Sequence, residues 1–265
     1  MDGSNRVAIV TGGASGIGQA TVQEFARSGA HVAIFDIQTE RAQKVRDALV
    51  AEGGSVEAYT VDVADAEACN AAVQAVAERW GRVDFLVNNA ISFISKGLDA
   101  TTADWEHCLG VNVRGFANMV QSCYPFMKQN KGSAIVNIAS ISAHIAQPNR
   151  WTYNATKGAI VSLTKCQALD LAIDGIRVNA VSPGWTWTPE VAKAANGDRE
   201  KWEPIWGRYH MLRRLGEPRE IARPILFLCS EDASFITGTE LLVDGGYMGL
   251  GSEGLGDTST FAGSK

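Results

Sequence analysis

A tyrosine and a lysine stand four residues apart, at Tyr153 and Lys157, in a segment whose spacing predicts a helix over 151–172. Residues at i and i+4 lie on one helix face, so the lysine ammonium falls near the phenol. A free phenol has a pKa of about 10 and is a poor base at neutral pH, whereas a nearby cation favours the phenolate and lowers that pKa. Taken alone, such a pair is more often a packing or surface feature. Its functional interpretation is a general acid–base centre.

Three further polar residues can complete such a centre. Ser140 follows a strand predicted over 134–138, and its hydroxyl can hold a substrate oxygen beside the Tyr153 hydroxyl. Ser142 competes for that role, and we interpret it as a wall of the pocket. Asn112 precedes a long helix predicted over 113–128.

A glycine-rich segment, Thr11-Gly-Gly-Ala-Ser-Gly-Ile-Gly18, follows a strand predicted over 6–10 and opens a helix predicted over 16–28. At such a junction a pyrophosphate approaches the backbone and the helix N-terminus, where unpaired N–H groups and the helix dipole favour anions. Side chains at the glycine positions would obstruct the turn, the ligand or the helix–strand contact. A tight turn without a ligand is the alternative. The flanking elements favour a dinucleotide site that includes Gly12, Ser15, Gly16, Ile17 and Gly18.

An aspartate, Asp36, ends the second predicted strand, over 31–35. A carboxylate there can accept hydrogen bonds from both hydroxyls of an adenosine ribose and would repel a 2′-phosphate, which favours NAD over NADP. Arg41, one helical turn further on, is the one residue that could accommodate a 2′-phosphate. Further dinucleotide contacts are expected where later strands end, at Asp62, Val63, Asn89 and Ala90.

Short apolar runs alternate with longer helical patterns along the whole chain. Strands with continuous Val/Ile/Leu character and intervening helices predict one α/β domain with a parallel sheet covered on both faces. The length of 265 residues, with 46% hydrophobic residues, suits one such core. We expect a dinucleotide-binding Rossmann domain over 1–248 and a tail rich in Gly and Ser over 249–265. The other predicted strands are 56–61, 85–87, 176–181 and 241–243, and the other predicted helices are 38–52 and 64–80.

Composition argues against several other classes of protein. The 24 basic and 29 acidic residues give a net charge of −5, which makes a nucleic-acid partner a poor candidate. The polar first residues do not resemble a signal peptide, and no apolar run approaches the roughly 18 residues of a membrane span. The five scattered cysteines suggest buried thiols rather than disulfides or a metal site. We therefore expect a cytoplasmic protein without a metal or a membrane partner.

The chain to about Gly246 resembles the short-chain dehydrogenases/reductases. Thr11–Gly18 is similar to the family pattern TGxxxGxG, and Asn88-Asn89-Ala90 to NNAG, with Ile91 in place of the glycine. The other motifs are the tetrad Asn112, Ser140, Tyr153 and Lys157, the PGxxxT pattern in Pro183, Gly184 and Thr188, and the C-terminal signature from Thr237-Gly238 to Asp244-Gly245-Gly246. The resemblance implies a seven-stranded sheet of order 3-2-1-4-5-6-7 and a homotetramer. Ile91 puts the local shape beside the substrate in question, and not the chemistry.

The resemblance also implies a role for each motif. Tyr153 removes the proton of a secondary alcohol while hydride passes from the same carbon to the nicotinamide of NAD. Ser140 stabilises the developing oxyanion, and Lys157 acidifies the phenol and holds the nicotinamide ribose. Asn112 anchors a water that continues the proton path. Pro183, Gly184 and Thr188 lie over the nicotinamide.

The substrate pocket is expected to include Ile91, Ser140, Ser142, Arg150, Tyr153 and Trp185. Arg150 can pair with a carboxylate through two N–H groups, or it is a solvated or interface arginine. Trp185 can cover the pocket mouth, or it packs only on protein. His144 opens the same segment as Arg150, and a structural role is favoured for it. These side chains favour a polar anionic small molecule, and the pattern resembles sugar-acid dehydrogenases of the 2-keto-3-deoxy-L-fuconate type.

Two other functions remain open at this point. One is an NADP-dependent reductase of an oxoacyl or other keto substrate on the same fold, against which Asp36 argues. The other is a dinucleotide-sensing protein without turnover, against which the presence of both Tyr153 and Lys157 argues. The tail is expected to be disordered, or else to bring Leu255 or Phe261 to a neighbouring subunit.

Overall fold

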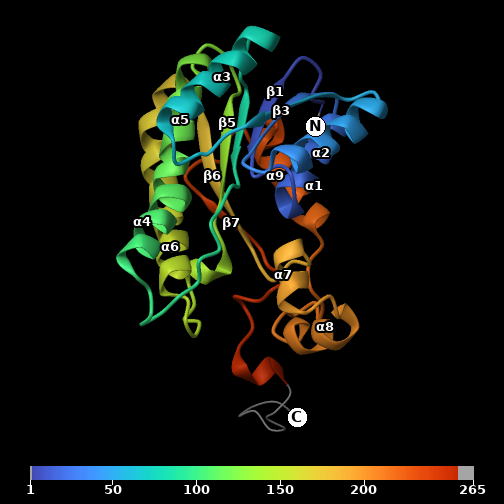
Figure 1. The fold of residues 1–265 in the computed structure, drawn as a ribbon, viewed down its shortest axis with the longest axis vertical. Coiled ribbons are helices and arrows are strands. Elements are labelled where there is room, and N and C mark those ends of the chain that lie inside the picture. Colours follow the sequence, from blue (N-terminus) through green and yellow to red (C-terminus); the bar gives the residue numbers. More distant parts are fainter. Residues whose placement is uncertain (1, 256–265) are drawn as a thin grey trace.

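The strands form one parallel sheet in the computed structural model, which describes residues 2–255 (Figure 1). Within those residues the sheet has seven strands in the order β3-β2-β1-β4-β5-β6-β7, as predicted. Because parallel strands point the same way, their carboxyl ends meet at one edge of the sheet. The strands are β1 (Val7–Thr11), β2 (His31–Asp36), β3 (Ser55–Thr60), β4 (Phe85–Asn88), β5 (Ala134–Ile138), β6 (Arg177–Pro183) and β7 (Glu240–Val243).

Helices cover both faces of the sheet (Figure 1). One layer contains α1 (Gly16–Arg27), α2 (Thr39–Ala51) and α9 (Pro218–Cys229). The other contains α3 (Ala66–Trp80), α5 (Gly115–Met127) and α6 (Trp151–Leu171). Successive side chains of β1 point to opposite faces of the sheet, so this one strand packs against both helix layers. Ala8 and Val10 pack into the first layer, while Val7 and Ile9 pack into the second.

The helix predicted over 113–128 differs from the observed structure. The chain is helical from α4 (Thr102–Leu109), passes through a π-helical turn at Gly110–Arg114 and continues as α5. The start of α4 carries a capping box, in which Thr101 and Asp104 satisfy each other's backbone N–H groups. The prediction missed this signal because it relied on apolar spacing alone.

Three helices after β6 were also missing from the sequence-based prediction. They are α7 (Pro189–Ala194), α8 (Arg199–Gly207) and α9. In α9 a proline stands in the first turn and Glu217 and Glu220 form a capping box, both of which are typical helix starts. Figure 1 shows α7 and α8 beyond the carboxyl edge of the sheet, below the glycine-rich end of α1.

No helix within residues 2–255 is long and apolar enough to cross a membrane. The described part of the tail contacts the segment before α9, because Arg213 Nη2 donates a hydrogen bond to the carbonyl of Gly254. The domain boundary at residue 248 stays a prediction. Phe261 lies outside the described residues, so its predicted contact with a neighbouring subunit also stays a prediction.

Candidate active site

The glycine-rich loop connects β1 to α1 at the carboxyl edge of the sheet. Gly12 and Gly16 have positive φ angles of 63° and 54°, a conformation that favours glycine. A Cβ atom on Gly18 would lie 2.1 Å from the carbonyl oxygen of Gly12, and one on Gly12 would lie 2.9 Å from Cα of Ala90. The backbone is therefore packed so closely here that only glycine fits. Such a loop at a helix N-terminus fits a pyrophosphate.

The side chains of Asn89 and Thr11 form hydrogen bonds that hold this loop in place. The Asn89 side-chain amide donates hydrogen bonds to the carbonyls of Thr11 and Gly12, at 3.0 and 3.1 Å. The Thr11 hydroxyl accepts from the backbone N–H groups of Asn89 and Ala90, at 2.9 and 3.0 Å. The Asn89 side chain is thus engaged in holding the loop, and its predicted cofactor contact stays a prediction.

The carboxylate of Asp36 is fixed beside the same loop. One oxygen accepts a hydrogen bond from the backbone of Ala14 at 3.0 Å, and the other accepts one from Gln38 at 2.9 Å. Each carboxylate oxygen retains capacity to accept another hydrogen bond. Asp36 therefore stands, oriented by the backbone, where the sequence predicts the adenosine ribose.

Two residues that follow β3, Asp62 and Val63, are predicted to contact the dinucleotide. The exposed Asp62 accepts a hydrogen bond from the backbone of Ala64 at 2.9 Å. Val63 is buried against Gly115, where a Cβ atom would come within 2.7 Å of its side chain. Its carbonyl also accepts from the Asn118 amide at 2.9 Å. Both residues lie at the predicted edge, and their adenine contacts stay predictions.

The loop after β6 crosses to the glycine-rich loop. A Cβ atom on Gly16 would lie 3.4 Å from the methyl group of Thr188, the residue that begins α7. Behind it, the Gly184 N–H donates to the carbonyl of Val243 at 3.1 Å. A Cβ atom on Gly184 would lie 2.8 Å from Cα of Asp244. The Pro183–Thr188 segment thus lies against the α1 N-terminus, and its predicted contacts with the dinucleotide stay predictions.

Tyr153 and Lys157 lie together near the N-terminal end of α6. The lysine Nζ is 5.7 Å from the centroid of the phenol ring and donates a hydrogen bond to the carbonyl of Ile138 at 2.7 Å. Burial lowers the pKa of Lys157 to about 7. Burial raises the pKa of Tyr153, while the Ser140 hydroxyl and the Arg150 charge lower it. The Ser140 hydroxyl and the Arg150 charge thus favour the phenolate, and the acidification of Tyr153 by Lys157 stays a prediction.

Ser140 and Ser142 have different partners. The Ser140 hydroxyl accepts from the backbone of Ser142 at 3.1 Å and begins a single turn of 3-10 helix over Ile141–Ala143. The Ser142 hydroxyl donates to the side chain of Gln147 at 2.7 Å. Ser140 is thus the serine whose hydroxyl acts on Tyr153, and Ser142 fits the role of a pocket wall.

Asn112 lies in the π-helical turn and is fully buried. Its side-chain oxygen accepts from the backbone of Ser92 at 2.7 Å. Its amide donates to the Ser92 carbonyl and to the Thr156 hydroxyl, both at 3.1 Å. Asn112 therefore ties the loop after β4 to helix α6. The predicted water contact of Asn112 stays a prediction.

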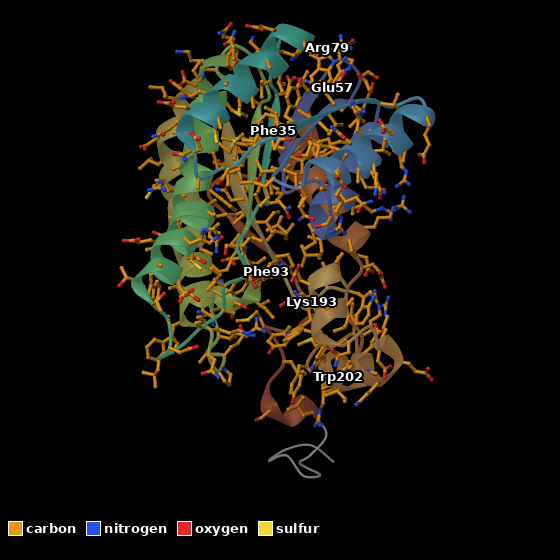
Figure 2. All side chains as sticks on the ribbon, viewed as in Figure 1. Phe35, Glu57, Arg79, Phe93, Lys193 and Trp202 are labelled. Carbon is orange, nitrogen blue, oxygen red and sulfur yellow. The ribbon has the colours of Figure 1, made fainter. Side chains whose placement is uncertain are left out.

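An aromatic side chain that the sequence analysis did not single out lies on the phenol. The ring of Phe93 stacks on Tyr153 at 5.6 Å with an interplanar angle of 14°, and 49% of its surface is exposed. Figure 2 shows it at the carboxyl edge, on the side of the sheet nearest Lys193 of α7. The sequence could have pointed to Phe93 through its position, since it lies two residues after Ile91, which is expected to line the substrate pocket. Ile91 itself is partly buried at that edge.

Arg150 and Trp185 form a pair on the other side of Tyr153. The guanidinium lies 5.8 Å from the centroid of the indole ring. Trp185 stacks in turn on Trp206 of α8 at 5.1 Å, and Trp206 stacks on Trp202 at 4.8 Å. The carbonyl of Arg150 accepts from the backbone N–H of Asn154 at 2.8 Å, whereas its guanidinium forms no hydrogen bond or ion pair within residues 2–255. Its guanidinium N–H groups are thus available to a ligand.

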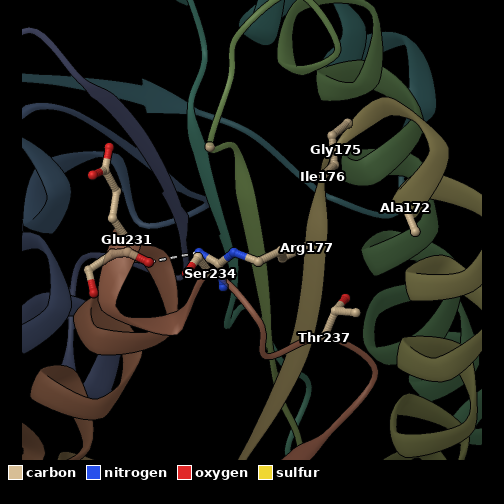
Figure 3. Close-up of a pocket in the computed structure, with 9 residues that line it drawn as sticks. Ala172, Gly175, Ile176, Arg177, Glu231, Ser234 and Thr237 are labelled. Carbon is tan, nitrogen blue, oxygen red and sulfur yellow. Dashed lines mark hydrogen bonds between the residues drawn. The ribbon is translucent and has the colours of Figure 1, made fainter.

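Two other features at first sight resemble sites. His144 Nε2 lies 2.8 Å from the carboxylate of Glu240, which supports the structural role favoured for it. A cavity of about 300 Å³ lies at the opposite edge of the sheet, around the first residue of β6 (Figure 3). Its arginine, Arg177, donates to the carbonyls of Leu228 and Ser230 at the end of α9. That cavity is therefore far from the candidate active site along β6, and its cation is engaged by the protein.

A doubly covered parallel sheet, a glycine loop and a Tyr/Lys pair at one edge define a dinucleotide-dependent oxidoreductase for alcohol or keto groups. Residues 12–248 match the family described as enoyl-(acyl carrier protein) reductase. The chain is 37% identical over 246 residues to a cyclohexanol dehydrogenase of Acinetobacter sp., covering 92% of this chain and 95% of that protein. It is 38% identical over 248 residues to a 3-oxoacyl-(acyl-carrier-protein) reductase of Thermotoga maritima, covering 92% and 98%.

The comparison of structures agrees with these similarities. Ligand-free aldohexose dehydrogenase of Thermoplasma acidophilum superimposes with a TM-score of 0.86 at 33% identity, covering 95% of this chain and 97% of that one. The chain belongs to the short-chain dehydrogenase/reductase family, whose members use NAD or NADP.

Proposed function

We propose that this protein is an NAD-dependent dehydrogenase that oxidises a secondary hydroxyl group of a small, polar, anionic molecule such as a sugar acid of the 2-keto-3-deoxy-L-fuconate type. The observation that carries the proposal is the meeting of Tyr153, Ser140 and Lys157 beside the glycine-rich loop. An acid–base group and a dinucleotide cradle at one edge are what a hydride-transfer enzyme requires.

Each residue of the proposed site has a separate role in the reaction. Tyr153, as phenolate, accepts the proton of the substrate hydroxyl, while Ser140 donates a hydrogen bond to the same oxygen as it becomes a carbonyl. The bound nicotinamide ring supplies the acceptor for the hydride that leaves the carbon. Lys157 and Asn112 lie on the proposed proton path. Asn112 also holds the loop after β4, which borders the proposed substrate site. Position and electrostatics are thus the protein's contributions.

The preference for NAD rests on Asp36. Its carboxylate is held beside the loop by Ala14 and Gln38, and a fixed negative charge there disfavours a 2′-phosphate. Ile37 follows it, where a basic residue would favour NADP. Arg41 is the residue that opposes this reading, since it lies partly buried one turn into α2.

The preference for an anion rests on Arg150. Its guanidinium has no carboxylate partner among residues 2–255, stands on Trp185 and acts on the Tyr153 phenol. A guanidinium in that setting can bind a carboxylate through two hydrogen bonds. The test is a screen of hydroxy acids, sugars and sugar acids with NAD and NADP in parallel, following absorbance of the reduced cofactor. Turnover of neutral alcohols alone would rule out the anionic substrate.

A second candidate function is reduction of an oxoacyl or other keto substrate. The 3-oxoacyl reductase among the relatives favours it, and the same residues serve both directions because Tyr153 donates in reduction the proton it accepts in oxidation. Preferential use of NADPH with a keto substrate in the same screen would select it. A non-catalytic dinucleotide sensor is disfavoured because both Tyr153 and Lys157 are present.

The remaining proposals concern assembly and location. We expect a cytoplasmic homotetramer with no nucleic-acid or membrane partner. Exposed apolar side chains support self-association, since Phe235 and Ile173 are fully exposed or nearly so and Leu242 is half-exposed on the edge strand β7. Light scattering on the purified protein should give the mass of four chains, and the mass of one chain would contradict the proposal.

A further inference from the structure

A buried histidine with no role in the chemistry above holds the loop that carries Trp185. His210 lies between α8 and α9 and is only 2% exposed. Its Nε2 accepts a hydrogen bond from the backbone N–H of Trp185 at 3.2 Å. A backbone N–H can only donate, so Nε2 carries no proton and the ring is neutral with its proton on Nδ1.

The ring is wedged against two backbone turns. A Cβ atom on Gly184 would lie 3.0 Å from His210 Nε2, and one on Gly245 would lie 3.5 Å from its side chain. Tyr247 closes the edge, with its ring centroid 5.2 Å away in a T-shaped contact. The imidazole therefore cannot move without displacing the turn that follows β6.

A chain of three contacts connects His210 to the reacting phenol. His210 fixes the backbone of Trp185, the Trp185 ring carries the guanidinium of Arg150, and the Arg150 charge acts on Tyr153. These contacts thus connect two segments that lie far apart in the sequence, the loop before α9 and the start of α6.

We infer that His210 is a positioning residue, which acts through Trp185 to hold the Arg150 guanidinium where it receives the anionic group of the substrate. The inference rests on the proposed function in one respect, the anionic substrate. Only the neutral imidazole performs this role, because a protonated Nε2 would face the Trp185 N–H with a second donor.

Charged and titratable groups surround the imidazole. Asp244, Arg214 and Glu220 line the same small cavity of about 100 Å³, and Tyr247 packs on the ring. Burial lowers the pKa of His210, which the backbone of Trp206 and Gly207 and the charge of Asp244 oppose. The lowered pKa favours the neutral form, so His210 takes up a proton at a lower pH than a free imidazole does.

The test uses two substitutions in the full-length protein. In His210→Gln the side-chain oxygen can still accept the Trp185 N–H, whereas in His210→Leu nothing can. The matched control is His31→Gln, because His31 bonds to Ser55 at the far edge of the sheet. The probes are 3-hydroxybutyrate and its methyl ester, which differ only in the charge.

For the leucine variant we expect KM for the acid to rise about tenfold, the effect of one lost hydrogen bond to a buried group, with kcat changed less than about twofold. The glutamine variant should restore most of the loss, and the His31 control should match the wild type. As pH falls below about 6.5, the wild-type KM for the acid should rise, and it should not rise in the glutamine variant. Equal KM values in the leucine variant and the wild type would overturn the inference.

A measurement without substrate separates this inference from the proposed function. Amide hydrogen exchange at Trp185 should quicken about tenfold in the leucine variant and stay slow in the glutamine variant. If the wild type turns over the ester and not the acid, the anionic substrate is wrong. His210 is then judged on exchange and on KM for the ester, and no change in either rejects it.

Discussion

The two sides of the candidate active site are built differently. On the dinucleotide side, main-chain atoms lie so close together that a single methyl group at Gly18 would overlap the carbonyl of Gly12. On the substrate side, Arg150, Trp185 and Trp206 are partly exposed side chains stacked on one another across long stretches of sequence. In the proposed function, the first side would bind a part common to many cofactors through backbone geometry. The second would select the substrate through side chains that a few substitutions can change.

The largest effect on activity should follow a substitution of Tyr153, which lies where the dinucleotide side and the substrate side meet. Tyr153→Phe removes the acid–base hydroxyl and keeps the ring that Phe93 stacks on. We expect kcat to fall by roughly 10²–10⁴-fold, while the dissociation constant for the dinucleotide, measured by fluorescence titration, changes little. Turnover within about twofold of the wild type would contradict the assignment of the base.

A substitution on the dinucleotide side should act through the backbone. Gly18→Ala places a methyl group 2.1 Å from the Gly12 carbonyl oxygen, so the loop must shift. Overpacking of this kind costs about 1–3 kcal/mol, which corresponds to a loss of roughly 5–150-fold in cofactor affinity. Gly53→Ala is a suitable control, because it lies in open space at a positive φ outside the site. Its cofactor affinity should equal that of the wild type.

A substitution on the substrate side should discriminate between substrates. Arg150→Met keeps much of the side-chain length and removes the charge. We expect KM for 3-hydroxybutyrate to rise roughly tenfold, as for a lost hydrogen bond to a charged group, with KM for its methyl ester unchanged. Equal effects on both substrates would show that Arg150 serves packing instead of recognition.

The smallest effect concerns stability and has the opposite sign to the effect on activity. Lys157 is buried with its pKa lowered to about 7, so it lacks a proton that the unfolded chain binds up to its ordinary pKa of about 10.4. Its contribution to stability is therefore present above about pH 10 and is lost as pH falls to about 7. Lys157→Met should raise the melting temperature at pH 7 by about 3 °C or more, and by less at pH 10, while it lowers turnover. A lower melting temperature at pH 7 would contradict the burial cost.

The family resemblance implied the strand order, and the residues themselves predicted a parallel sheet and most of the side chains at its carboxyl edge. They did so because a strand buried on both faces must be continuously apolar, and because polar residues directly after such strands share one edge. The sequence-based prediction failed at α4 and α9, where capping boxes mark the helix starts. Its assignment of the acidification of Tyr153 to Lys157 stays a prediction, with the lysine Nζ 5.7 Å from the centroid of the phenol ring.

Spacing along the chain was enough to predict the glycine-rich loop and the Tyr153/Lys157 pair, since glycine positions and an i, i+4 pair depend only on local geometry. Phe93 on Tyr153, Arg150 on Trp185 and the buried His210 were decided by the folded molecule alone. These contacts join segments separated by tens of residues, and the identity of each partner depends on how helices α6 and α8 pack beyond the sheet. Local periodicity carries no information about that packing, and it is there that the proposed substrate pocket lies.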